Sequence, residues 1–493
     1  MKLLTMEKLK ISLQTERGLR VRAILGREFA GGPPALRTIG KFLRNLALSL
    51  ILVWFATAGN AAAQNADTNS AAWLTQPLSL ISALNTALQR NAAILKGKND
   101  LEASYGIVVQ TRAVALPAVQ ATGKYQDEET TLTPSGLPFA LPHQPWSAGV
   151  QVVQSVYNGG KLTAAVRAAR LTKEQALAQY QTVISDALLA TRVAYYDVLL
   201  AAQQITVHEA SVNLLQKELE DQQRRYNVGT VPHFNVLRAE VSVANERPLL
   251  IQARNNYRIA KNNLSNLLGY NLPRDIWEDI PLRLTDTLDA VPYQVNLPDA
   301  IQHALSSRSE LAALRKAEGL QQLNIVNAKS GYKPTVQVFA GYNWINNPFN
   351  ADVGNKLEGW NAGGQMTWNI FDGLLTHGKV VQARALHDKS KTDLADQSRQ
   401  IELQVRTAYS DFIEAKEVLD SQQTVLAEAD EALREARARA DAGTGTQLDV
   451  LDAETSLTRA RTTNVQALHD YAAARAKLER AIGEDMVQTA AAK

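Results

Sequence analysis

Cysteine is absent from the 493-residue sequence, which excludes disulfides, thiolate metal sites and lipid attachment at an N-terminal cysteine. The seven histidines are scattered, and His208-Glu209 lacks the second histidine of a helical zinc motif. The sequence also has no Gly-x-Ser-x-Gly motif and no phosphate-binding glycine-rich loop ending in Lys-Ser or Lys-Thr. These absences argue against catalysis, a metal site or a cofactor. His208 lies on a seven-residue apolar repeat of a predicted coiled coil, where a polar residue that sets helix register is a better explanation than a metal ligand.

Long apolar runs are missing after the leader, where nothing approaches the ~18 apolar residues of a transmembrane helix. In the leader, Lys41 and Arg44 precede the apolar run Leu46–Ala58, and Ala61-Ala62-Ala63 follows. This run is too short for a stable membrane anchor, and a small-residue cleavage site comes directly after it. We therefore predict a secretory signal cleaved near Ala63. The alternative is an uncleaved anchor.

Excess positive charge is confined to this leader. Residues 1–63 contain ten Lys and Arg and three Glu, a net charge of +7, whereas the whole chain carries +3. The remainder therefore carries −4, and the sequence does not indicate a nucleic-acid partner.

The rest of the chain is organised around an internal duplication. Trp146–Gly269 and Trp360–Gly483 match without a gap at an offset of 214 residues, so that Arg192 corresponds to Arg406 and Tyr195 to Tyr409. The preceding segment, predicted to be helical from Pro77 to about Arg112, repeats at an offset of 217. Each copy reads as a helix, two strands, a very long helix, a turn and a returning helix.

Apolar residues recur every seven positions in both long helices, which predicts left-handed coiled coils. Gly160 to about Asn227 contains no proline, so this helix could extend roughly 100 Å at 1.5 Å per residue. The repeating positions are Val198, Ile205, Val212, Leu219 and Tyr226 in the first copy, and Phe412, Leu419, Leu426, Leu433 and Ala440 in the second.

Two pairs of strands are predicted, because apolar and polar residues alternate on both sides of each of two loops. Thr335–Trp344 and Trp360–Ile370 alternate in this way around the loop Asn346–Glu358, and the first copy has its loop at Thr130–Pro145. Strands of this length, with Gln and Asn on the polar face, suit a transmembrane β-barrel that contacts outer-membrane lipid. The alternative is a hairpin packed on a soluble core.

Four strands cannot close a barrel, and open strand edges are not tolerated in lipid. We therefore expect a homotrimer with twelve strands, in which the long helices close into the same ring. The fold class is mixed and mainly α, a trimeric α-helical barrel joined to a β-barrel. The expected regions are 1–63 (signal peptide and leader), 64–116 (N-terminal periplasmic helices), 117–158 (first barrel hairpin), 159–269 (first long-helix repeat), 270–297 (linker), 298–333 (second entry helix), 334–372 (second hairpin), 373–483 (second long-helix repeat) and 484–493 (tail).

The sequence resembles the TolC family of outer-membrane channels over nearly all of Pro77–Gly483. The resemblance rests on the duplicated plan and on Tyr157-Asn-Gly-Gly160, Arg225-Tyr-Asn-Val-Gly-Thr230 and Gly443-Thr-Gly-Thr-Gln-Leu-Asp-Val-Leu-Asp-Ala453. It implies an exit duct in the outer membrane with a large periplasmic portion. It also implies a periplasmic adaptor protein and an inner-membrane pump or ATP-driven transporter as partners.

Small-molecule efflux and one-step (type I) protein secretion share such a channel, and the sequence leaves both open. A structural trimeric coiled coil is a further alternative, although it would not explain the strands. The resemblance places two turns at the periplasmic tip, where they would contact the adaptor. Their residues are Gly229, Thr230 and Val231 in the first copy and Gly443, Thr444 and Gly445 in the second.

A gate is predicted beside these turns. Asp449 and Asp452 are expected in the first turn of the returning helix, behind Thr446, where carboxylates favour a helix N-terminus. They match the aperture-lining pair that the resemblance implies, although helix capping alone is the alternative. Their equivalents in the first copy are Asn235 and Arg238. We hypothesise that Arg238 pairs with Asp449 or Asp452 when the tip is closed.

The sequence departs from the family pattern at two nearby positions. Gly445 stands where the family has a basic turn residue, and Ala440 where it has an aromatic one. The closed state would therefore be weaker, or would rest on Arg238 instead.

Overall fold

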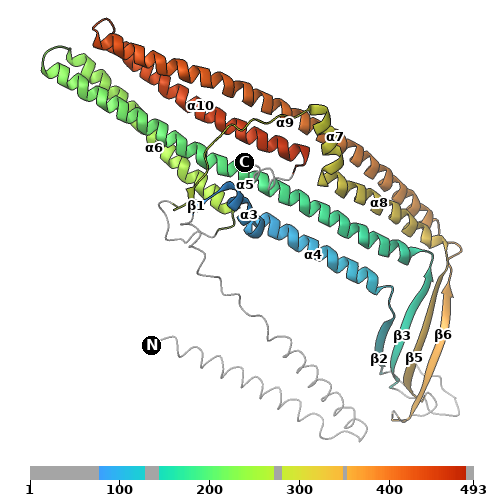
Figure 1. The fold of residues 1–493 in the computed structure, drawn as a ribbon. Coiled ribbons are helices and arrows are strands. Elements are labelled where there is room, and N and C mark those ends of the chain that lie inside the picture. The colour runs from blue at the N-terminus through green and yellow to red at the C-terminus, as the bar shows by residue number, and fades with distance from the viewer. Residues whose placement is uncertain (1–76, 128–143, 271–279, 348–351, 353, 485–493) are drawn as a thin grey trace, which may run out of the picture. The chain divides into compact units, whose positions relative to one another are not determined.

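The computed structural model describes residues 77–127, 144–270, 280–347, 352 and 354–484 (Figure 1). The predicted leader and signal cleavage, most of the first strand-connecting loop, part of the second loop, part of the linker and nearly all of the tail lie outside the described residues. Two compact units are distinguished. One comprises the parts of the strands within Gln120–Gln151 and Gly341–Asn361, and the other contains all the described helices.

Two helices of equal length form the framework of the helical unit. Helix α5 spans Lys161–Asn227 and α9 spans Leu375–Asp441, each with 67 residues. At 1.5 Å per residue each is about 100 Å long, as predicted for the first copy. Each reverses into a shorter helix, α6 (His233–Leu267) or α10 (Gln447–Ile482), so that the unit contains two long helical hairpins (Figure 1).

The two returning helices differ in how many of their residues are buried. Helix α10 packs along both α9 and α5, whereas α6 packs mainly along α5. Consequently 18 of the 36 residues of α10 are buried, against seven of the 35 residues of α6. The predicted heptad positions Phe412, Leu419 and Leu433 of α9 are buried in these contacts.

The predicted helix from Pro77 to Arg112 is two helices, α3 (Leu80–Arg90) and α4 (Ala92–Ala113). Asn91 causes the break, because its side chain accepts hydrogen bonds from the backbone N–H groups of Ala93 and Ile94 and so starts a new helix. Its Nδ2 also donates to the carbonyl oxygen of Leu267, at 2.7 Å. In the second copy α7 (Leu297–Ser307) and α8 (Ser309–Lys329) are also separated by a single residue, Arg308, which makes no side-chain cap, and the 3₁₀ turn η4 (Ser330–Tyr332) follows.

A short parallel strand pair joins the entry region to the linker. Strand β1 (Pro77–Leu78) pairs with β4 (Arg283–Leu284). The hydroxyl of Tyr195 donates to the carbonyl oxygen of Leu78 at 2.9 Å, which ties this pair to α5. Tyr195 is fully buried, and burial raises the pKa of its phenol.

A buried ion pair connects the middle of α5 to the end of α10. Arg192 donates to Glu479, and the two side chains are 1% and 0% exposed. Glu479 also accepts from Arg475, at 2.7 Å, and Arg192 donates to the hydroxyl of Tyr196, at 3.0 Å. This cluster satisfies charges that would otherwise be costly to bury.

The sheet has the order β2-β3-β5-β6, with β2 (Ala118–Tyr125), β3 (Trp146–Asn158), β5 (Thr335–Asn346) and β6 (Lys356–Thr367). Both edge strands, β2 and β6, are exposed along their whole length. The return strand begins at Lys356 and ends at Thr367, earlier at both ends than the predicted Trp360–Ile370. Beyond its end, the indole N–H of Trp368 donates to the carbonyl oxygen of Tyr332, at 3.2 Å. No helix in the described ranges is long and apolar enough to cross a membrane.

Candidate gate at the tips of the helical hairpins

Both hairpins reverse through the same type of turn. Gly229 and Gly443 adopt left-handed backbone conformations, with φ of 76° and 73°. The following residues, Thr230 and Thr444, donate their backbone N–H groups to the carbonyl oxygens of Arg225 and Arg439, each at 2.9 Å. This is a Schellman motif, in which glycine ends the helix because it adopts positive φ without strain. Gly229 and Gly443 therefore end the two long helices.

The turn in the second copy is more tightly closed than its equivalent. A Cβ on Gly445 would lie 2.9 Å from the Cβ of Arg439 and 3.1 Å from the backbone nitrogen of Ala440. A larger residue therefore cannot occupy this position without displacing the end of α9. This close approach explains why glycine stands where the family pattern has a basic residue.

Asp449 caps the returning helix α10. Its carboxylate accepts from the backbone N–H of Thr446 at 2.9 Å, and Thr446 Oγ1 accepts from the backbone N–H of Asp449 at 3.2 Å. These reciprocal bonds form a capping box, and the bond from the Thr446 backbone holds the pKa of Asp449 below its usual value. The capping role predicted from the sequence is thus present, and the carboxylate is ionised at neutral pH.

Asp452 does not lie in the first turn, where the sequence analysis placed it. Because α10 begins at Gln447, Asp452 is the sixth helical residue and lies in the second turn. It is exposed, as is Asp449. The expectation was wrong because, with Thr446 as the N-cap, the first turn contains only about four residues and ends near Val450.

Arg238 and Asn235 lie on α6, near the start of the other returning helix, and are half-buried. Within the described part of a single chain, Arg238 forms no ion pair with Asp449 or Asp452. Near the tips, Arg225 of α5 instead contacts Asp441 of α9 across the two hairpins, at 3.3 Å. Sequence reasoning missed it, although Arg225 stands in a stretch that marks the family.

An amide network joins α5 to the first turn of α10. Gln222 donates to Glu218 at 2.9 Å and to Gln447 at 2.7 Å, and Gln447 also donates to Glu218. Gln222 is buried beneath the tip. These three side chains hold the two hairpins together, and nothing in a single sequence marks them, because Gln and Glu are common on exposed helix faces.

A second polar contact lies about two turns further along α10. Glu454 is 1% exposed and accepts from Arg437 of α9 at 2.9 Å, while its Oε2 has no hydrogen-bond partner in the described part of the chain. Burial raises the pKa of Glu454, although Arg437 opposes the shift. The tip therefore combines an exposed, fully ionised aspartate with a buried glutamate that is costly to ionise.

The predicted structural role of His208 is supported by its contact. Its Nδ1 lies 2.7 Å from Glu246 Oε1, which links α5 to α6. Across the described residues, no cluster of three or more His, Cys, Asp or Glu side chains is arranged to hold a metal ion. The described tips thus present exposed charges and hydrogen-bonded side chains that join the two hairpins.

Comparison with known proteins identifies the family. Residues 83–270 and 300–484 match the model of the outer membrane efflux protein family. The chain belongs to this family. It is 23% identical over 427 residues to outer membrane protein TolC of Escherichia coli (strain K12), a match that covers 83% of each chain. It is 22% identical to the proteases secretion protein PrtF of Dickeya chrysanthemi, over 84% of this chain and 91% of that one.

The fold also matches solved channels. The outer membrane channel CmeC of Campylobacter jejuni superimposes with a TM-score of 0.72 at 15% identity, covering 83% of this chain and 88% of that chain. The predicted fold class, an α-helical barrel with a β-barrel, is confirmed. This member of the family is thus an outer-membrane efflux channel with a large periplasmic portion, and not an enzyme. Channels of this type are trimeric and work with adaptor and inner-membrane pump partners.

Proposed function

We propose that three copies of this chain form the exit duct of a tripartite efflux system, closed at the periplasmic end by the two hairpin tips. The observation that carries the assembly is the four-stranded sheet with two exposed edges, β2 and β6. Since unpaired strand edges are too costly in lipid, β6 of one copy would pair with β2 of the next. Twelve strands would then close one barrel.

Exposed apolar side chains on the outer helices support the same assembly. Val109, Val114 and Leu116 of the α4 region, and Val381 and Leu403 of α9, are all exposed in the single chain. Helices α4 and α9 lie at opposite edges of the row α4-α5-α8-α9, in which each helix packs on the next. Association of identical copies would bury both apolar edges, which favours a closed ring over a monomer.

The gate that we propose consists of Asp449 and Asp452, gathered by threefold symmetry into a ring of six carboxylates. Such a ring attracts cations and repels anions. Arg238 forms no pair with these aspartates within one chain, so the proposed closed-state contact would be made with the aspartates of a neighbouring copy. The turns at Thr230 and Thr444 would remain exposed for the adaptor.

Planar-bilayer recording tests the gate. Asp449→Asn combined with Asp452→Asn should weaken cation preference, because the ring loses its charge. Glu428→Gln combined with Glu431→Gln, which removes two exposed acids of α9 outside the tip, serves as the charge-matched control. Arg238→Ala should raise conductance if it closes the tip. Unchanged ion selectivity in the aspartate double variant would remove these residues from the pore, and a stable monomer in native mass spectrometry would refute the assembly.

Protein secretion is the second proposal, because PrtF, a proteases secretion protein, matches over nearly its whole length. Deleting the gene and measuring both antibiotic susceptibility and secreted proteins would separate the two cargo classes. Adaptor contact is tested in the same strain. Thr230→Asp or Thr444→Asp should impair transport while the trimer still assembles, whereas equal loss of assembly would assign these turns to folding alone.

A further inference from the structure

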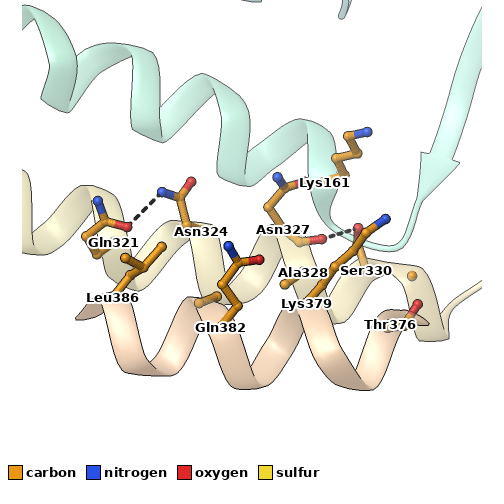
Figure 2. Close-up of a pocket in the computed structure, with 12 residues that line it drawn as sticks. Lys161, Gln321, Asn324, Asn327, Ala328, Ser330, Thr376, Lys379, Gln382 and Leu386 are labelled. Carbon is orange, nitrogen blue, oxygen red and sulfur yellow. Dashed lines mark hydrogen bonds between the residues drawn. The ribbon is translucent and has the colours of Figure 1, made fainter. Parts of the chain in front are cut away.

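A polar cleft lies where the strands join the long helices, at the other end of α5 and α9 from the proposed gate. Its volume is about 470 Å³, within the range of small-ligand sites. The first turn of α5, one face of α8 with η4, and the first three turns of α9 line it (Figure 2). The cleft belongs entirely to the helical unit.

The lining is basic and rich in hydrogen-bond donors. Lys161 of α5 and Lys379 of α9 line it together with four amide side chains and the hydroxyls of Ser330 and Thr376, and no carboxylate is among the lining residues. In Figure 2, Lys379 rises from α9 toward Ser330, and Lys161 lies at the start of α5. The four amides are Gln321, Asn324, Asn327 and Gln382.

Both ammonium groups are available to a ligand, since neither lysine forms an ion pair in the described part of the chain. The two carboxylates that flank the cleft in sequence already have partners. Asp372 accepts from the backbone N–H of Thr376 at 2.9 Å and from its hydroxyl, and Glu318 lies 3.4 Å from His387. A third lysine, Lys333, adds positive charge beside the start of α5, where its Cβ approaches Gly159.

Two close backbone approaches fix the walls of the cleft. A Cβ on Gly331 would lie 2.5 Å from Thr376 Oγ1, and one on Gly159 would lie 2.8 Å from the carbonyl oxygen of Ser330. Glycine at both positions therefore lets η4 pack directly against α5 and α9. The lysines are thus attached to elements whose separation is set by backbone contact.

We propose that this cleft binds a phosphate group. Lysine binds phosphate as a point charge, and the amide side chains offer N–H donors to its several acceptor oxygens. The hydroxyls of Ser330 and Thr376 already donate to the Asn327 carbonyl oxygen and to Asp372, so the lysines and amides carry the proposal. Because the chain is an outer-membrane channel, the strand–helix junction lies near the membrane boundary, where exposed Trp368, Phe371 and Leu374 also lie. The phosphate could therefore come from a phospholipid headgroup or from a phosphorylated solute passing through the duct, and both present the same chemistry.

Binding to the full-length protein in detergent tests the proposal with two probes. Inorganic phosphate is titrated at constant ionic strength against chloride, and its ³¹P line width is followed. Retention of phosphatidylglycerol is compared with that of diacylglycerol, which has the same acyl chains but no phosphate, by native mass spectrometry. The variants are Lys161→Gln, Lys379→Gln and, as a control on the same helix outside the cleft, Lys389→Gln.

We expect saturable binding of at least one phosphate probe, weakened about fivefold by Lys379→Gln or Lys161→Gln, the factor expected for one exposed charge contact. The Lys389→Gln protein should bind as the unmodified protein does. Lysine-dependent binding of inorganic phosphate would assign a soluble ligand, and lysine-dependent retention of phosphatidylglycerol alone would assign a lipid. Absence of both, or equal loss in the control, would overturn the proposal. Channel conductance is recorded in parallel, so that this failure is distinguishable from failure of the proposed duct.

Discussion

The duplication provides a matched pair of arginines with which to measure what burial contributes to stability. Arg192 and Arg406 are equivalent in the repeat, and both lie within 67-residue helices. Arg192 is 1% exposed and paired with buried Glu479, whereas Arg406 is 54% exposed and paired with Glu402 one turn before it on α9. Replacing either residue by Met preserves an unbranched stem, so the comparison isolates the environment of the charge.

The expected losses in the free energy of unfolding differ several-fold between the two variants. Removing one partner of a buried ion pair costs ~3–5 kcal/mol, because the remaining charge is left buried without its partner. Glu479 keeps Arg475 at 2.7 Å, so we expect Arg192→Met to fall near the low end, about 3 kcal/mol, or roughly a hundredfold in the unfolding equilibrium. Exposed pairs spaced by four residues contribute only ~0.3–0.5 kcal/mol, so Arg406→Met should be almost neutral.

Urea unfolding of the detergent-solubilised protein, followed by circular dichroism, measures the difference. The Arg192→Met protein should unfold at a clearly lower urea concentration than the Arg406→Met protein. Adding Glu479→Gln to Arg192→Met should recover part of the loss, since the unpaired buried charge is then removed. Equal midpoints for the two single variants, or no recovery in the double variant, would refute the argument from burial.

Three further predictions concern the tip. Thr446→Ala should destabilise the start of α10 by about 1 kcal/mol, measured as faster amide exchange there, because the capping box is lost. Gly445→Ala should disturb the same turn through contact with Arg439 and should weaken adaptor binding in a pull-down. Because burial raises the pKa of Glu454, the folded protein binds the carboxyl proton more tightly than the unfolded chain does. The free energy of unfolding should therefore fall as the pH rises from the ordinary pKa of 4.5 through the raised pKa. Glu454→Gln should flatten this pH dependence, measured by urea titrations at several pH values.

The lengths and ends of the long helices were predictable because they depend on local rules. The absence of proline and the seven-residue spacing predict a helix, and Gly229 and Gly443 end it through positive φ. The break at Asn91 could have been found in the same way, since asparagine is a favoured N-cap, but apolar periodicity continues on both sides and concealed it. The gate role proposed for Asp449 and Asp452 was suggested only by the family pattern.

The partners of charged side chains were not predictable, because they depend on which helices meet. Sequence equivalence suggests equal environments for Glu240 and Glu454, yet Glu240 is exposed and Glu454 is buried. The reason is that α10 lies against both α9 and α5, whereas α6 packs mainly on α5. Periodicity within one helix carries no information about this second neighbour. The contacts Arg225–Asp441 and Gln222–Gln447 were missed for the same reason.

The additional packing of α10 on α5 determines which part of the α9–α10 hairpin can separate from α5. The contacts between α10 and α5 change along the length of α10. Near the tip Gln447 makes amide hydrogen bonds, and further along the hydroxyl of Thr458 donates to Ser211. At the base, Glu479 forms the fully buried ion pair with Arg192.

Neutral hydrogen bonds contribute about 1 kcal/mol each, and the charged groups near the tip, Glu218 and the Arg225–Asp441 pair, are at least partly exposed, so these contacts can be exchanged for water. Separating a buried ion pair costs several times more. The α9–α10 hairpin can therefore leave α5 at its tip while its base stays attached. A gate at Asp449 therefore lies at the end of α10 where separation from α5 costs the least free energy. A gate near Glu479 would stay closed, because the buried ion pair holds α10 against α5 there.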